Sequence, residues 1–157
     1  MDLGLRGRVA LVAAGSRGLG FAVAQELAAN DAAVVICARG VEALEAASAT
    51  LERAGGRVHG VPADVSVPED LDRVVDAAMR AYGQVDILVT NSGGPRSGRF
   101  ETLTAADWEA AGQVLLTSAV RFAQAVLPGM RQRKWGRILN ITSIAAKQPV
   151  DGLMLSN

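Results

Sequence analysis

Short apolar runs alternate along the chain with segments in which apolar residues recur at helical spacing. Each run has the length of a β-strand and is rich in Val, Ile, Leu and Ala. The runs are Arg8–Ala14, Ala32–Ala38, Arg57–Pro62, Val85–Thr90 and Arg137–Ile141. We therefore predict five strands that are separated by helices.

The clearest helical pattern spans Leu71–Tyr82, where the apolar residues fall on one face. Ser66 and, three residues later, Glu69 predict a capping box at its start. Shorter patterns over Leu19–Leu27 and Val41–Leu51 predict helices after the first and second strands.

A fourth helical pattern precedes the last strand, and Thr104 with Asp107 predicts a second capping box there. Pro128 predicts that this helix ends or kinks, because proline disrupts helical hydrogen bonding. The apolar side of this helix carries Trp108, Leu115, Ala119, Phe122 and Val126.

The alternation of strand and helix favours an α/β fold with one open, doubly wound parallel sheet of the Rossmann type. We predict a single domain over residues 1–157, with strand order 3-2-1-4-5 and helices on both faces. In that order a ligand crevice opens at the carboxyl ends of the first and fourth strands. The turn after the first strand and the segment Thr90–Pro95 are expected to flank it, beside Ile141–Ile144.

The composition narrows the classes of partner. Apolar residues make up 50% of the chain and aromatic residues only 4%, which predicts a core of Val, Leu, Ile and Ala. Lys plus Arg and Asp plus Glu number 16 each, so the charge balance points neither to nucleic acid nor to an anionic membrane. A small-molecule partner fits better.

Cys37 is the single cysteine and lies within an apolar run. It predicts a buried thiol, no intrachain disulfide and a reducing compartment. The apolar run in the N-terminal segment MDLGLRGR is too short for a signal sequence or a spanning helix. We therefore expect a soluble, cytoplasmic protein, and we predict no metal site.

The stretch AAGSRGLG, at Ala13–Gly20, joins the first strand to the first helix. Gly15, Gly18 and Gly20 allow a sharp bend and a close approach of a ligand, since they lack a Cβ atom. The N–H groups and dipole at the helix start favour an anion, the dipole by about 0.3 to 1 kcal/mol at an exposed site. Although the spacing differs from GxGxxG, this strand, turn and helix predict a dinucleotide site.

Four motifs in chain order resemble the short-chain dehydrogenase/reductase family, in its 3-oxoacyl carrier-protein reductase-like branch. They are AGSRGLG, ADV at Ala63–Val65, DILVTNSGG at Asp86–Gly94 and GRILNITS at Gly136–Ser143. The resemblance runs along the whole length of this chain, which corresponds to the N-terminal three fifths of a domain of that family. It implies a nicotinamide dinucleotide as cofactor.

The family's sheet usually has seven strands, so the resemblance also implies a fold that is incomplete at the C-terminus. Arg137–Ile141 would then be an exposed apolar edge. We expect the chain either to be part of a longer protein or to cover this edge in a homo-oligomer.

The end of the second strand bears on the choice of cofactor. An acid there would bind the ribose 2′-hydroxyl of NAD, whereas this chain has Ala38 and Arg39. Arg39 and Arg17 carry the charge for bonds to a 2′-phosphate, each worth about 1.5 to 3 kcal/mol. NADP is therefore predicted over NAD. The alternative is that both arginines are solvated loop charges.

The resemblance assigns further residues to the cofactor. Asp64 would accept a bond from the adenine amino group, and Val65 would donate its backbone N–H. Asn91 would tether the fourth strand and border the ribose, followed by Ser92 and Gly93 at the same strand end. The alternatives are a plain loop before a helix and an ordinary turn. The predicted cofactor-binding set is Gly15, Ser16, Arg17, Gly18, Leu19, Gly20, Arg39, Asp64, Val65, Asn91, Ser92 and Gly93.

By the same resemblance, the reaction uses a serine, a tyrosine, a lysine and an asparagine. Ser143 stands in the serine position, where it would bond a substrate oxygen; the alternative is a strand-end cap. Ser156 falls where the tyrosine is expected, Leu115 falls where the asparagine is expected, and the lysine position lies beyond Asn157. Ser143 and Ser156 are the candidate catalytic residues.

Two functions follow from these residues. One is an NAD(P)-dependent oxidoreductase of the short-chain type, which reduces a carbonyl or oxidises an alcohol by hydride transfer. The other is a catalytically silent NADP-binding module, favoured by Leu115 and Ser156, because loss of a positioned general acid costs about 100- to 10,000-fold in rate. Tyr82 and His59 are the single residues of their types, and both are predicted to be structural.

Overall fold

The computed structural model describes residues 3–157 and contains one parallel sheet with the strand order β3-β2-β1-β4-β5. Met1 and Asp2, which begin the N-terminal segment considered above, lie outside the described residues. The strands are β1 Val9–Val12, β2 Ala33–Ala38, β3 Arg57–Pro62, β4 Ile87–Thr90 and β5 Arg137–Asn140. The predicted fold class and strand order are confirmed.

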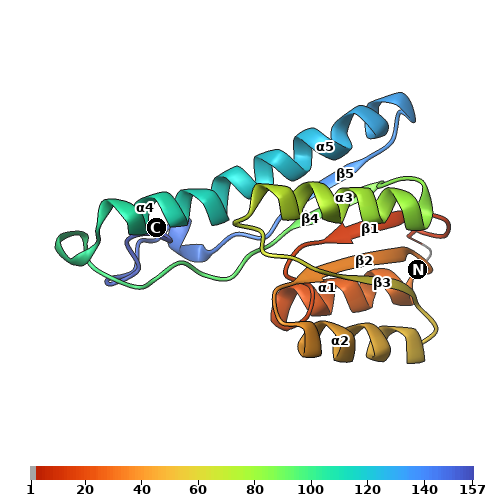
Figure 1. Ribbon diagram of the computed structural model, residues 1–157, viewed down its shortest axis with the longest axis horizontal. Helices are drawn as coiled ribbons and strands as arrows, with labels where there is room; N and C mark the ends of the chain where they lie inside the picture. The colour runs from red at the N-terminus through yellow and green to blue at the C-terminus, as the bar shows by residue number, and fades with distance from the viewer. Residues whose placement is uncertain (1–2) are drawn as a thin grey trace.

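Helices cover both faces of the sheet (Figure 1). The helices are α1 Gly18–Ala29, α2 Val41–Arg53, α3 Pro68–Tyr82, α4 Ala105–Gly112 and α5 Ser118–Gln132. One core lies under α1 and α2 and another under α3 and α5, because the alternate residues of the buried strands β1 and β2 point to opposite faces. Short 3₁₀ helices span Phe100–Thr102 and Ile144–Ala146, and a π-helical segment, Gln113–Thr117, joins α4 to α5.

One of the two predicted capping boxes is wrong. The residue that caps α3 is Val67, without a side-chain bond, and Pro68 starts the helix. The Ser66 hydroxyl instead donates to Asp64 Oδ1 at 2.7 Å. The reason is that Pro68 suits the first helical position, where its missing N–H costs no hydrogen bond, so the helix starts one residue later than the Ser66 pattern implied.

The second predicted capping box is confirmed. The Asp107 carboxylate accepts the Thr104 N–H at 2.9 Å, and the Thr104 hydroxyl accepts the Asp107 N–H at 3.3 Å. The hydrogen bonds from Thr104 hold the pKa of Asp107 below its usual value. The helix that starts here continues through Pro128 to Gln132, so of the two outcomes predicted for Pro128, an end or a kink, the end does not occur.

The apolar side of this long helix is only partly buried. Phe122 and Val126 are buried in the core, whereas Trp108 and Leu115 are half-exposed. Figure 1 shows the reason: α4 extends past the end of the sheet, so its apolar side has no strand beneath it. By length and composition Ala105–Gln132 is long and apolar enough to cross a membrane, and it is the one such helix in the described part of the chain.

The last strand forms one edge of the sheet, as predicted. β5 pairs only with β4 among the described strands, with Leu139 opposite Val89. Ile138 is 40% exposed and Leu139 is 49% exposed. This edge therefore presents apolar side chains and unpaired backbone groups to solvent.

A buried carboxylate ties the amino ends of the central strands together. Asp86 is fully buried, and its Oδ2 accepts the Val9 N–H at 3.1 Å and the Gln84 amide at 2.8 Å. Arg133 Nε donates to Asp86 Oδ1 at 3.3 Å. Arg8 lies 3.8 Å above the ring of Trp135 at the same end.

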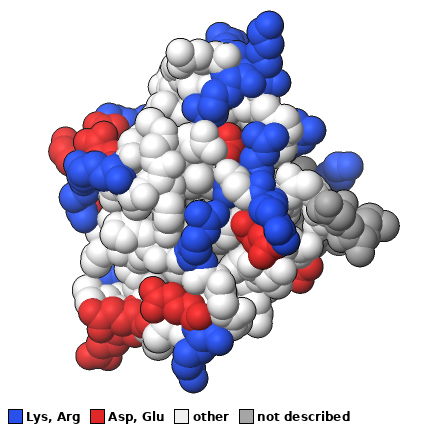
Figure 2. Space-filling view, turned by 90° about the vertical axis from the view of Figure 1, so that its right-hand side faces the viewer, with Lys and Arg blue, Asp and Glu red and all other residues white. Residues whose placement is uncertain are grey.

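Basic and acidic side chains are interspersed on the face of the molecule drawn in Figure 2.

Candidate nucleotide-binding site

A cavity of about 660 Å³ lies where the carboxyl ends of four strands meet. Its size falls in the range of small-molecule and cofactor sites. The turn after β1 and the segment after β4 flank it, as the strand order predicts. The residues that line it are Ala14, Ser16, Arg17, Gly18, Leu19, Ala38, Arg39, Gly40, Ala43, Ala63, Asp64, Val65, Asn91, Ser92, Gly93, Gly94 and Val114.

Two glycines let the turn after β1 fold tightly against its neighbours. A Cβ atom on Gly20 would lie 2.4 Å from the Ala14 carbonyl oxygen, and one on Gly15 would lie 2.8 Å from Ile36 Cγ2. Gly18 has a φ of +54°, a conformation that other residues rarely adopt. The turn therefore leaves no room for a side chain at Gly15 or Gly20, and these two glycines pack behind the cavity and do not line it.

The start of α1 faces the cavity with free backbone donors. Arg17 is the N-cap residue, and its side chain makes no capping bond. The first N–H groups of an α-helix have no partner within the helix, and the helix dipole places positive charge at the same point. Gly18 and Leu19 line the cavity at this point, so an anion can take the place of a side-chain cap.

Asn91 joins the two strands that flank the cavity. Its side-chain amide donates to the Ala14 carbonyl oxygen at 3.4 Å, and the Ala13 N–H donates to the Val89 carbonyl at 3.0 Å. The ends of β1 and β4 are thereby held in register. Ser92 and Gly93 follow in the loop that forms the next part of the cavity wall.

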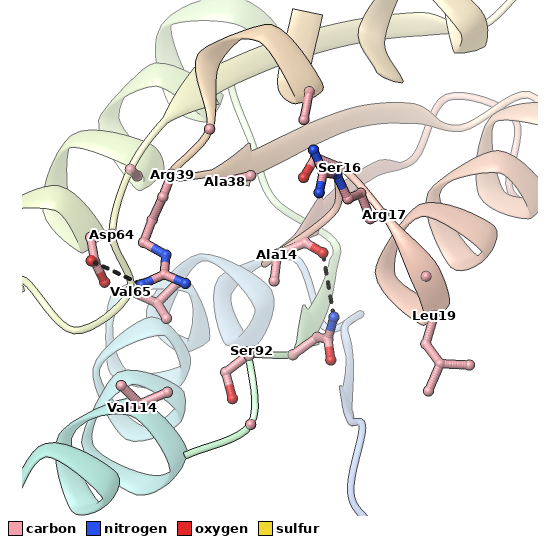
Figure 3. A pocket seen from close by; sticks show the side chains of 17 residues that line it. Ala14, Ser16, Arg17, Leu19, Ala38, Arg39, Asp64, Val65, Ser92 and Val114 are labelled. Carbon is pink, nitrogen blue, oxygen red and sulfur yellow. Dashed lines mark hydrogen bonds and ion pairs between the residues drawn. The ribbon is translucent and has the colours of Figure 1, made fainter. Parts of the chain in front are cut away.

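Arg39 and Asp64 lie on the opposite wall (Figure 3). Arg39 Nη1 lies 3.9 Å from Asp64 Oδ2, and the Arg39 side chain is 76% exposed. The Asp64 N–H donates to Asp70 Oδ2 at 2.7 Å, and Asp70 pairs in turn with Arg73. The Asp64 N–H, more than the Arg73 side chain, holds the pKa of Asp70 below its usual value.

The two candidate catalytic serines lie outside the described lining of the cavity. Ser143 follows β5, is exposed, and accepts the Ala145 N–H on its Oγ at 3.1 Å, so it makes the strand-end cap named above as its alternative role. Ser156 is half-buried, and its N–H donates to the Leu153 carbonyl at 2.8 Å. The structure does not bring either serine together with the residues that line the cavity.

The predicted cofactor-binding set leaves out several lining residues, and most of them are small. Ala38, Gly40, Ala43, Ala63 and Gly94 contribute backbone and methyl groups, which carry no chemical signal in a sequence. Val114 lies in the π-helical segment between α4 and α5. Segments of this kind are frequent at functional sites, but residue spacing alone does not reveal them.

The remaining reactive side chains are not part of the described cavity lining. Cys37 is buried in β2, and burial raises the pKa of its thiol from 9.0 to about 11. Tyr82 packs partly against the core, and burial raises its pKa. His59 is exposed on β3, at the edge of the sheet. In the described part of the chain no group of three or more His, Cys, Asp or Glu side chains is placed to hold a metal ion.

Comparison with known proteins supports the same reading of the fold. The chain is 35% identical over 149 residues to the human "Dehydrogenase/reductase SDR family member 4", an alignment that covers 94% of this chain and 54% of the human protein. It is 34% identical over 139 residues to the "Short-chain reductase protein NovJ" of Streptomyces niveus, covering 88% of this chain and 53% of that one. The chain thus spans about half the length of these curated relatives.

Solved structures are similar over nearly the whole chain. L-sorbose reductase from Gluconobacter frateurii, complexed with NADPH and L-sorbose, has a TM-score of 0.95 at 36% identity, over 99% of this chain and 60% of the reductase. A metagenomic short-chain oxidoreductase in complex with NADP has a TM-score of 0.89 at 36% identity, over 96% of this chain and 69% of the other. The family profile described as "short chain dehydrogenase" matches residues 8–155. This chain therefore belongs to the short chain dehydrogenase family.

Proposed function

We propose that the cavity binds NADP(H) and that the chain supplies the cofactor-binding part of a short-chain oxidoreductase. The observation that carries this proposal is the position of Arg39. It lines the cavity directly after β2, where an acid would otherwise select NAD, and its guanidinium group is largely exposed.

We assign each part of the cofactor to residues on one wall of the cavity. The uncapped start of α1 would hold the pyrophosphate through the backbone of Gly18 and Leu19. Arg39, with Arg17 across the turn, would hold the 2′-phosphate by charge-assisted bonds. The close packing at Gly20 keeps this helix end near enough to the cavity for such contacts.

The adenine and the ribose would lie along the remaining walls. Asp64 and Val65 line the wall after β3, where an adenine amino group would meet a carboxylate and a backbone N–H. Asn91, Ser92 and Gly93 line the wall after β4, where the ribose would lie. Two solved relatives with high structural similarity hold NADPH or NADP, which supports this choice of cofactor.

The proposed reaction is reduction of a carbonyl or oxidation of an alcohol. When bound, the nicotinamide supplies or accepts the hydride, and the Ser143 hydroxyl would bond the substrate oxygen.

Leu115 and Ser156 support a second candidate function, an NADP-binding module without turnover. A leucine side chain cannot hold a water molecule for proton transfer, and an unassisted serine hydroxyl is a poor acid.

Binding is tested first, with the affinities of the chain for NADPH and NADH measured by titration calorimetry. We expect NADPH to bind more tightly, and we expect Arg39→Asp to remove this preference. Arg80→Asp, on the exposed side of α3, is the charge-matched control and should leave the preference unchanged. A preference for NADPH that survives in Arg39→Asp overturns the assignment of Arg39.

Turnover separates the two candidate functions. NADPH oxidation is followed with a panel of aldehydes, ketones and short acyl thioesters. Oxidation that depends on substrate and is lowered in Ser143→Ala supports the oxidoreductase. Tight binding of NADPH without oxidation across the panel supports the binding module.

We further propose a soluble, cytoplasmic location and a homo-oligomeric state. The exposed apolar residues Ile138 and Leu139 on the edge strand support association. The buried, unpaired thiol of Cys37 is compatible with a reducing compartment.

A further inference from the structure

We infer that Asp64 is a positioning residue that lowers the preference for NADPH over NADH, because its carboxylate competes with the 2′-phosphate for Arg39. This inference rests on the proposed binding of a nicotinamide dinucleotide. The two side chains line the same cavity from the ends of neighbouring strands, with Arg39 after β2 and Asp64 after β3. Figure 3 shows the Arg39 side chain reaching across to the Asp64 carboxylate.

The Asp64 carboxylate is fixed by its own local bonds. Its Oδ1 accepts the Ser66 N–H at 2.9 Å and the Ser66 hydroxyl at 2.7 Å. The backbone of Asp64 is held as well, because its N–H donates to Asp70 Oδ2 at 2.7 Å. Asp64 Oδ2 is the oxygen that faces Arg39. One carboxylate oxygen is thus anchored, and the other presents its charge to the guanidinium group.

Arg39 is the more exposed partner of this pair. Its side chain is 76% exposed, compared with 35% for Asp64, and the separation of 3.9 Å is that of an ion pair without a close hydrogen bond. An exposed pair of this kind is weak and is easily exchanged for another anion. The guanidinium group can therefore turn from the fixed carboxylate to a 2′-phosphate, with which it can form two parallel hydrogen bonds.

The competition has a defined sign. Binding of a cofactor with a 2′-phosphate requires that the Arg39–Asp64 ion pair break, whereas binding of a cofactor with a 2′-hydroxyl does not. Removing the carboxylate charge therefore favours NADPH over NADH. Contacts of Asp64 to the adenine are common to both cofactors, so they cancel when the two affinities are divided.

The test is the ratio of the NADH to the NADPH dissociation constant, measured by titration calorimetry in Asp64→Asn, in Arg39→Gln and in the double variant. We expect the ratio to rise about three-fold in Asp64→Asn, from the strength of an exposed ion pair. We expect Asp64→Asn to leave the ratio unchanged when it is added to Arg39→Gln.

Asp31→Asn is the matched control, because Asp31 pairs with Arg6 at 2.8 Å on the exposed surface and is not among the described residues that line the cavity. Asparagine also tolerates the positive φ of Asp31. The inference is overturned by an unchanged or lower ratio in Asp64→Asn, or by an equal rise in the presence and absence of Arg39. If the parent chain binds neither dinucleotide, the proposed function itself fails, which is a different result from binding with an unchanged ratio.

Discussion

Gly20 lies so close to Ala14 that a Cβ atom on it would stand 2.4 Å from the Ala14 carbonyl oxygen. The same atom would stand 2.8 Å from Nδ2 of Asn91, whose amide donates to that carbonyl. The start of α1, the end of β1 and the end of β4 therefore meet at one point beside the cavity. Any change that widens this point moves the helix donors away from the proposed position of the pyrophosphate.

We expect Gly20→Ala to weaken NADPH binding and to lower the free energy of unfolding by about 1 to 3 kcal/mol, the usual cost of overpacking. Calorimetry measures the first effect and urea unfolding the second. Gly112→Ala is the control, since Gly112 has helical dihedral angles and open space around its Cα. It should keep the affinity and stabilise the helix by up to about 1 kcal/mol. Equal behaviour of the two variants would refute the role of Gly20.

Asp86 supplies a prediction about stability. Its buried carboxylate accepts hydrogen bonds from Val9, Gln84 and Arg133. Asp86→Ala leaves these donors without their acceptor, so we expect the free energy of unfolding to fall by about 3 kcal/mol. Urea unfolding provides the measurement.

The control for Asp86 is Asp151→Ala, because Asp151 pairs with Arg99 at 2.5 Å with both side chains exposed. Exposed pairs contribute at most about 1 kcal/mol, so this variant should unfold close to the parent. A loss in Asp86→Ala no larger than that in Asp151→Ala would mean that the buried network contributes little.

The exposed edge of the sheet leads to a prediction about association. We expect Leu139→Lys to reduce self-association, because a charge on β5 disfavours contact between unpaired strand edges. Sedimentation velocity over a range of protein concentrations measures the effect. Leu3→Lys is the control, since Leu3 is 51% exposed and lies outside the strands. Unchanged association in Leu139→Lys would place any interface elsewhere.

The strand order and the position of the cavity could be predicted from the sequence because both depend on patterns that the chain repeats. Each apolar run is followed by a helical pattern, and right-handed crossovers then leave few arrangements of the sheet. Residues such as Arg39 and Asn91 follow their strands directly, so the shared edge of a parallel sheet brings them to one cavity.

Other features depend on local competition that spacing does not reveal. Ser66 has the pattern of a helix cap, but its hydroxyl bonds Asp64 because Pro68 starts the helix. Pro128 stays within α5, since packing of Phe122 and Val126 in the core outweighs the loss of one hydrogen bond. Ser143 matches a motif in sequence, yet its side chain caps the turn after β5.

Cys37 provides a prediction about pH. Burial raises the pKa of its thiol from 9.0 to about 11 in the folded chain. Between these values the unfolded chain releases this proton and the folded chain keeps it, so stability must fall as the pH rises. The expected slope within this window is up to about 1.4 kcal/mol per pH unit, and below the window the thiol has no effect. Urea unfolding at pH 8 and pH 10 measures it.

Cys37→Ala isolates this effect, because the other titrating groups, including Tyr82 with its raised pKa, are common to both chains. The parent should lose more stability than Cys37→Ala between pH 8 and pH 10. A thiol that is buried and protonated should also react with a disulfide reagent far more slowly in the folded chain than in urea. Equal pH dependence in the two chains, together with rapid labelling of the folded parent, would show that the thiol is accessible to solvent in solution.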